Sequence, residues 1–152
     1  FNSALIKALM ASNMTLVPNA VVLVSVADRD KHDAGKLVGK LLEAGCSIYA
    51  TEGTASMIRD MGAKVTLVTK KLGQGYPNVV DVIREGTVSA VINTVSDSAK
   101  TLRDGFYIRR AAAEKRIPCY TSLDTANVAA ESLLISSETF NVESVDKYLN
   151  AE

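Results

Sequence analysis

Short apolar runs alternate with helical segments along this chain, and this alternation limits the folds that it can adopt. The run AVVLVSV at 20–26 is apolar and rich in β-branched residues, as in a strand buried on both faces of a sheet. Four similar runs follow at 46–51, 64–69, 89–95 and 117–122. Because helices separate the runs, we predict an α/β fold with a three-layer, doubly wound, Rossmann-like parallel sheet of five strands.

The segments between these runs carry apolar side chains at helical spacing. Leu5, Ile6 and Leu9, for example, share one face of the first segment. Gly45 and Gly62 close two other segments and are suitable helix C-caps. The predicted helices lie at 1–12, 28–45, 53–62 and 79–86, in the second half of 97–116 around 108–116, at 124–135, and within the tail after 135.

Size and charge narrow the classes of function. The chain has 152 residues, of which 47% are hydrophobic and 22% are charged, as in a single soluble globular domain. Its 17 Lys and Arg balance 17 Asp and Glu, so bulk charge does not attract it to nucleic acid or to a membrane surface. It has no signal peptide and no apolar run of about 18 residues. We therefore expect no nucleic-acid partner, no membrane association and a cytoplasmic location.

The two cysteines, Cys46 and Cys119, have neither the spacing of a metal site nor that of a CxxC motif. Each lies beside a predicted strand, so we interpret both as small core residues of a protein in a reducing compartment. No other cluster has metal-ligand spacing, and we predict no metal site. The opening FNSALIKALMAS lacks an initiator Met, which suggests a piece of a longer protein.

Each predicted strand delivers polar side chains to its carboxyl end. Parallel strands end at the same edge of a sheet, and doubly wound sheets bind ligands there. The residues at this edge offer hydroxyl, amide or ammonium groups or an open backbone: Ser25, Lys31, Thr51, Gly53, Thr54, Lys70, Asn93, Thr94 and Thr121.

Three of these residues, Thr51, Gly53 and Thr54, open a predicted helix and suit a phosphate monoester. The first amides of a helix lack partners, the helix dipole favours anions, and glycine permits a close approach. Lys31 and Lys70 would add point charges from neighbouring strands. Taken alone, either threonine is more often a plain N-cap, and Lys70 is more often a solvated loop residue, so both interpretations stay open.

The remaining candidates carry less chemistry. Asn93 offers both a donor and an acceptor, which suits a base or a sugar. His32 is the single histidine, and we do not expect it to be catalytic. The SDS segment at 96–98 has no paired base for a nucleophilic triad. Arg109 and Arg110 lie on a basic helical face at 106–116 that could contact a neighbouring domain or an effector.

A family resemblance rests on five segments: SVADRDK, ATEGTA, VTKKLGQGYPNVVDVIREG, VINTVSDS and IRRAAAEKRIPCYTSLDTA. They resemble the methylglyoxal-synthase-like domain, specifically the C-terminal allosteric domain of the carbamoyl-phosphate synthase large subunit. The resemblance covers roughly residues 1–135. It implies a leading helix and linker from the preceding synthetase half at 1–18, the regulatory domain at 19–137 and a C-terminal tail at 138–152.

The resemblance implies that the parent protein is an ATP-dependent ligase. Such a synthase makes carbamoyl phosphate from glutamine or ammonia, bicarbonate and ATP, for pyrimidine and arginine synthesis. The parent uses ATP, Mg or Mn, and K at centres outside this domain, which itself holds no cofactor and no catalytic residue. The implied partners are the rest of the large subunit, the glutamine amidotransferase small subunit, and nucleotide effectors, typically UMP and in some bacteria IMP.

Effector-binding residues follow by the same resemblance. Those that bind phosphate fall on Lys31, Thr51, Gly53, Thr54 and Lys70, and those near the base and sugar fall on Ser25, Asn93 and Thr94. Thr121 falls near an interface linked to activation by ornithine. The chain departs from the family pattern at 95–99, where it reads VSDSA in place of Thr, Ser, Gly and two basic residues, and at Tyr120, where an Asp can stand. These departures bear on which effector binds.

Two alternatives to a noncatalytic regulatory domain remain open. A methylglyoxal synthase-type lyase would reuse the phosphate turn but needs a carboxylate base. The segment GQGYPN at 73–78 has no acid, and only Asp97 lies near the second acidic position of that family. The other alternative is a structural or interaction domain with a vestigial site.

Overall fold

One parallel sheet organises the molecule. The computed structural model describes residues 2–70, 75–95, 99–134, 144 and 146. Among these residues, five parallel strands pair in the order β3-β2-β1-β4-β5. The strands are β1 (Val21–Ser25), β2 (Ser47–Ala50), β3 (Thr66–Leu67), β4 (Ala90–Asn93) and β5 (Cys119–Tyr120).

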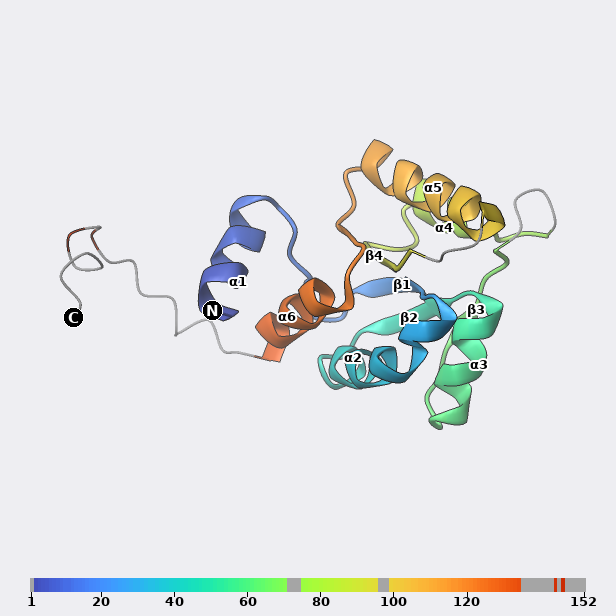
Figure 1. Cartoon of the computed structure of the whole chain (residues 1–152), viewed down its shortest axis with the longest axis horizontal. Coiled ribbons are helices and arrows are strands. Elements are labelled where there is room, and N and C mark those ends of the chain that lie inside the picture. Colours follow the sequence, from blue (N-terminus) through green and yellow to red (C-terminus); the bar gives the residue numbers. More distant parts are fainter. Residues whose placement is uncertain (1, 71–74, 96–98, 135–143, 145, 147–152) are drawn as a thin grey trace.

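Helices cover both faces of this sheet (Figure 1). They are α1 (Asn2–Ala11), α2 (Lys31–Glu43), α3 (Glu52–Asp60), α4 (Val79–Arg84), α5 (Ala99–Glu114) and α6 (Leu123–Leu134), with a short 3-10 turn η1 (Asp28–Asp30) before α2. The helices α2, α3 and α6 lie on one face, α4 and α5 lie on the other, and α1 packs against α6. The predicted three-layer, doubly wound α/β fold is confirmed.

The central strand β1 is buried on both sides, as its apolar composition predicted. Its side chains alternate between the two faces. Val22 and Val24 belong to the core under α2, α3 and α6, whereas Leu23 belongs to the core under α4 and α5. All three are fully buried, so β1 joins the two layers of helices.

The helix α2 shows how pattern and local chemistry set an element. Ala34, Leu37, Val38 and Leu41 recur at helical spacing and are its buried residues. Gly45 follows the helix with a φ of 79°, and its N–H donates to the carbonyl of Leu42 at 3.0 Å. The predicted C-cap is therefore confirmed, because glycine adopts this left-handed conformation at little cost.

Two element boundaries differ from the predictions. Helix α5 begins at Ala99, well before the expected second half of 97–116. Gly105 lowers helix propensity there, but it is buried together with Ile108 and Ala112, and this packing outweighs propensity. Strand β3 is limited to Thr66–Leu67 because it is an edge strand with both side chains exposed. The helix expected after residue 135 lies outside the described residues.

Both cysteine side chains are free thiols. Cys46 is buried in the core, as predicted, whereas Cys119 is only partly buried. Burial raises the pKa of both thiols above the ordinary value. Among the described residues, no helix combines the length and the apolar character needed to cross a bilayer.

Tyr120 fixes the segment between α1 and β1. Its ring is 1% exposed, and its hydroxyl donates to the carbonyl of Met14 at 2.7 Å. Burial raises the pKa of Tyr120 far above its usual value, so the hydroxyl stays protonated and acts as a donor. Tyr120, where the chain departs from the family pattern, therefore links the last strand to the leading segment, and the two partners are 106 positions apart in the sequence.

We expect Tyr120→Phe to lower the free energy of unfolding by about 0.5–1.5 kcal/mol, because the ring still fills the core while the hydrogen bond is lost. Urea denaturation would measure this change. Tyr107→Phe is the matched control, since Tyr107 is 40% exposed and its hydroxyl has no hydrogen-bond partner among the described residues. Equal stabilities of the two variants would contradict the anchoring role of Tyr120.

Candidate functional site

The predicted effector residues converge on one pocket at the carboxyl edge of the sheet. The strand order reverses between β1 and β4, and Ser25 pairs in register with Asn93 across this point. Ligand sites of doubly wound sheets lie at such a switch point. The pocket has a volume of about 190 Å³ and is lined by eight predicted residues, Ser25, Lys31, Thr51, Gly53, Thr54, Lys70, Asn93 and Thr94.

The ninth predicted residue, Thr121, lies elsewhere. It lines a wider neighbouring groove of about 680 Å³, whose walls come from η1, α2, α6 and the residues that follow β4 and β5. Acidic and basic side chains both line this groove, among them Asp33 and Lys40. Thr94 lines both hollows, so the two are adjacent.

The turn before α3 is more than a helix cap. Thr51 occupies the N-cap position, but its side chain makes no capping hydrogen bond. Its hydroxyl bonds to the Ser25 hydroxyl at 3.2 Å, and the Thr54 hydroxyl accepts the N–H of Val26 at 3.2 Å. Both threonines are buried. The plain N-cap interpretation is therefore wrong, because these hydroxyls hold the start of α3 against the end of β1.

The backbone at the start of α3 is left open for an anion. The N–H groups of Glu52, Gly53 and Thr54 have no hydrogen-bond partner among the described residues, as is usual for the first turn of a helix. These three residues line the pocket. The helix dipole adds positive potential at the same place.

The ammonium group of Lys31 lies directly against this turn. A Cβ placed on Gly53 would come within 3.1 Å of Lys31 Nζ, so the missing side chain leaves room for the ammonium group. Lys70, which follows β3, lines the same pocket. Lys70 makes no ion pair or hydrogen bond with any described residue. Two positive charges therefore flank the open amides.

Asp28 was not assigned a role from the sequence, although it stands three residues before Lys31. Its Oδ1 lies 2.7 Å from Lys31 Nζ. The hydrogen bond and the charge of Lys31, together with the charge of Lys70, hold the pKa of Asp28 below its usual value. The Asp28 side chain is 93% exposed, so it can turn away without losing buried contacts. A carboxylate thus occupies part of the space that the lysines offer to an anion.

The β4 side of the pocket is held by a second set of hydrogen bonds. The Thr94 hydroxyl accepts the N–H of Ala27 at 2.8 Å. Asn93 Nδ2 donates to the carbonyl of Ser25 at 3.1 Å, and Asn93 Oδ1 accepts from Arg109 Nη1 at 2.9 Å. Asn93 and Thr94 are buried. These residues line the pocket and also fix the chain that leaves β1.

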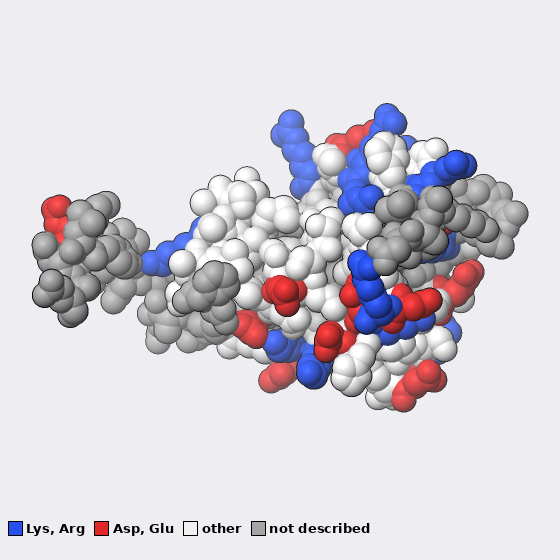
Figure 2. Space-filling model, in the orientation of Figure 1, with Lys and Arg blue, Asp and Glu red and all other residues white. Residues whose placement is uncertain are grey.

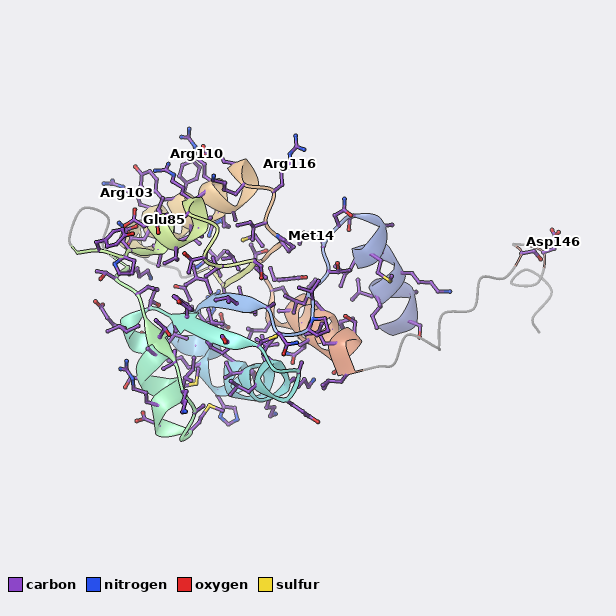
Figure 3. The ribbon with its side chains drawn as sticks, turned by 180° about the vertical axis from the view of Figure 1, so that it is seen from behind. Met14, Glu85, Arg103, Arg110, Arg116 and Asp146 are labelled. Carbon is purple, nitrogen blue, oxygen red and sulfur yellow. The ribbon has the colours of Figure 1, made fainter. Side chains whose placement is uncertain are left out.

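The interpretation of Arg109 and Arg110 as one outward basic face is wrong for Arg109. Arg109 turns inward to Asn93, whereas Arg110 bonds to Glu114 at 2.8 Å on the exposed side of α5. Figure 3 shows Arg110 at the outer edge of the helix, with Arg103 and Arg116. The two neighbours separate because consecutive residues of a helix point in different directions. Figure 2 shows Lys and Arg side chains projecting from this side of the molecule.

Other sequence candidates contribute less to the pocket. His32 is exposed on α2 and does not line the pocket. The described lining includes two carboxylates, Asp28 and Glu52. Residues 96–98, which hold Asp97 and most of the departure from the family pattern, lie outside the described residues, as do residues 73 and 74 of the GQGYPN segment.

Comparisons with known proteins agree with the fold. Residues 33–121 match the family described as MGS-like domain. The whole chain is 43% identical to 14% of the carbamoyl phosphate synthase large chain of Thermomicrobium roseum. Over 138 residues, or 91% of the chain, it is 38% identical to 25% of the C-terminal section of the carbamoyl phosphate synthase large chain of Methanopyrus kandleri. The chain thus spans a quarter or less of the length of these relatives.

The family match includes the second, third, fourth and fifth strands, and with them Thr51, Lys70 and Asn93, while Ser25 and Lys31 precede it. The longer match to the carbamoyl phosphate synthase large chains covers all the residues that line the pocket. The resemblance stated from the sequence motifs is confirmed. The chain belongs to the MGS-like domain family.

Proposed function

We propose that this chain is a noncatalytic regulatory domain of a glutamine-hydrolysing carbamoyl-phosphate synthase large chain, and that its pocket binds the phosphate of a nucleoside monophosphate effector. The observation that carries the proposal is the unpartnered first turn of α3 beside Lys31 and Lys70. Backbone amides, a helix dipole and two ammonium groups together favour a doubly charged phosphate over neutral ligands. UMP is the first candidate and IMP the second, as the family resemblance implies.

The size of the pocket is consistent with binding of the phosphate end of a nucleotide, with the other end left outside. Pockets that enclose a drug-sized ligand have volumes of roughly 300–1,000 Å³. The 190 Å³ enclosed here suits a phosphate with part of a sugar. The base of a nucleotide would extend outward, past Asn93 and Thr94 on the β4 side.

Regulation would follow from linkage between effector binding and the arrangement of the parent protein. An effector shifts an equilibrium only by the difference between its affinities for the two states. Couplings of about 1–3 kcal/mol are typical of allosteric proteins. The partners in this proposal are the rest of the large chain, to which α1 and the segment held by Tyr120 lead, and the glutamine amidotransferase small subunit.

We expect the chain to bind UMP at one site and to lose roughly five- to tenfold in affinity on Lys70→Gln, because one charge at the phosphate is removed. Calorimetric titration in phosphate-free buffer would measure this. Lys64→Gln is the matched control, since Lys64 is exposed and precedes β3, at the amino ends of the strands and away from the pocket. Equal losses in the two variants, or equal binding of UMP and uridine, would contradict a phosphate site.

Assays of the unaltered chain also test the two alternative functions. Steady phosphate release from dihydroxyacetone phosphate would favour the lyase, and an absence of binding by UMP, IMP and inorganic phosphate would favour a vestigial site.

Thr54→Val is a poor probe of the phosphate site, because it also removes the acceptor of the Val26 N–H. Thr54→Ser keeps that bond and should retain UMP binding.

We expect Asp28→Asn to tighten UMP binding by roughly two- to fivefold, because the phosphate no longer competes with a carboxylate for Lys31. The control is Asp33→Asn, which removes the same charge from an exposed residue of the neighbouring groove. Parallel calorimetric titrations would separate local competition from the change in net charge. Weaker binding by Asp28→Asn, or the same gain in both variants, would show that Asp28 does not compete.

A further inference from the structure

Three residues from three elements, α5, β4 and β1, form a chain of hydrogen bonds that ends at the pocket. Arg109 Nη1 of α5 donates to Asn93 Oδ1 at 2.9 Å, and Asn93 Nδ2 donates to the Ser25 carbonyl at 3.1 Å. Gly105 lies one helical turn before Arg109. Arg109 is absent from the pocket lining, whereas Asn93 belongs to it. The hydrogen-bonded route from Arg109 to the pocket therefore runs through the amide of Asn93.

The two partners of Asn93 allow one orientation of its amide. A guanidinium group can only donate hydrogen bonds, and a backbone carbonyl can only accept them. Turning the Asn93 amide over would place its NH2 group against Arg109 and its oxygen against the Ser25 carbonyl, with two unfavourable contacts. The observed orientation leaves the second hydrogen on Nδ2 without an acceptor among the described residues.

Gly105 provides the space that this arrangement needs. A Cβ at position 105 would lie 2.7 Å from Arg109 Nη1 and 3.2 Å from Asn93 Oδ1. Glycine in the middle of a helix is destabilising relative to alanine, so its presence in a helix of 16 residues is explained by this close approach. The nearest atom belongs to the flexible end of Arg109, so an alanine would displace the guanidinium group and leave the helix intact.

We propose that Arg109 and Gly105 are positioning residues, which hold the amide of Asn93 as a hydrogen-bond donor toward the part of the ligand beyond its phosphate. This inference rests on the proposed function. The phosphate would bind at α3, Lys31 and Lys70, whereas the oriented Nδ2–H would select a ligand with an acceptor oxygen or nitrogen at the β4 side. Arg109 thus sets selectivity among phosphate esters and leaves affinity for the phosphate group itself unchanged.

The test compares Arg109→Met, Gly105→Ala and the double variant, with Arg110→Met as control because Arg110 pairs with Glu114 on the surface. Calorimetry would measure the affinities for UMP and for inorganic phosphate. We expect each single variant to bind UMP roughly tenfold more weakly, as for the loss of one oriented hydrogen bond. Affinity for inorganic phosphate should stay unchanged, and the double variant should lose no more than either single variant, because both disrupt one interaction.

A second measurement does not depend on a ligand. The side-chain amide of Asn93 gives an NMR signal of its own, which should shift in Arg109→Met and in Gly105→Ala but not in Arg110→Met. Arg109→Lys, which retains a cationic donor, should partly restore both this signal and the affinity for UMP. Urea denaturation of each variant would show that the fold is retained.

Each failure has a distinct result. An unchanged Asn93 signal in Arg109→Met and Gly105→Ala would overturn the positioning role, whatever the chain binds. Equal losses of affinity for UMP and inorganic phosphate would make Arg109 a general structural residue and would overturn the inference while leaving the phosphate site in place. If the unaltered chain binds neither ligand, the proposed function and the selectivity inferred from it both fail.

Discussion

Two threonine hydroxyls accept the backbone N–H groups of Val26 and Ala27, and the architecture of the pocket depends on these bonds. The central strand β1 ends at Ser25, so the amides that follow must find acceptors outside the sheet. Thr54 and Thr94 provide these acceptors from α3 and from the end of β4. The same bonds hold the start of α3 and the end of β4 against the end of β1, at the carboxyl edge of the sheet. The acceptors that the end of β1 requires therefore also line a polar pocket.

The charges of the pocket are balanced internally. Lys31 and Lys70 lie near the positive end of α3, and bringing these positive charges together without an anion is unfavourable. Asp28 supplies a negative charge from an exposed position, at a contact of 2.7 Å with Lys31. Lys31 is thus held in place before any ligand arrives, and the carboxylate that holds it is one that can leave. The ion pair between Asp28 and Lys31 therefore has two effects: it orders the lysine side chain in advance, and it competes with an anionic ligand for that lysine.

Much of this arrangement is predictable from the sequence, and the errors have physical causes. Parallel strands end at one edge, so the residue types at the strand ends were enough to predict eight of the twelve residues that line the pocket. The plain-cap interpretation of Thr51 was wrong because a hydroxyl at an N-cap can bond either to its own helix or to a neighbouring strand. Here the Thr51 hydroxyl bonds to Ser25 of β1. Arg109 resembled Arg110 because periodicity over a short basic segment does not show how the helix is rotated against the sheet.

The sequence by itself determined the class of fold, the family and the chemical character of the site, because these depend on local pattern and on residue type. Only the tertiary structure decided which donor meets which acceptor. The bonds from Val26 and Ala27 join residues 28 and 67 positions apart, and the bond from Tyr120 to Met14 spans 106 positions. Such pairings depend on how α3, β4 and β5 lie relative to β1 and to the segment before it, and packing of the whole core sets those positions.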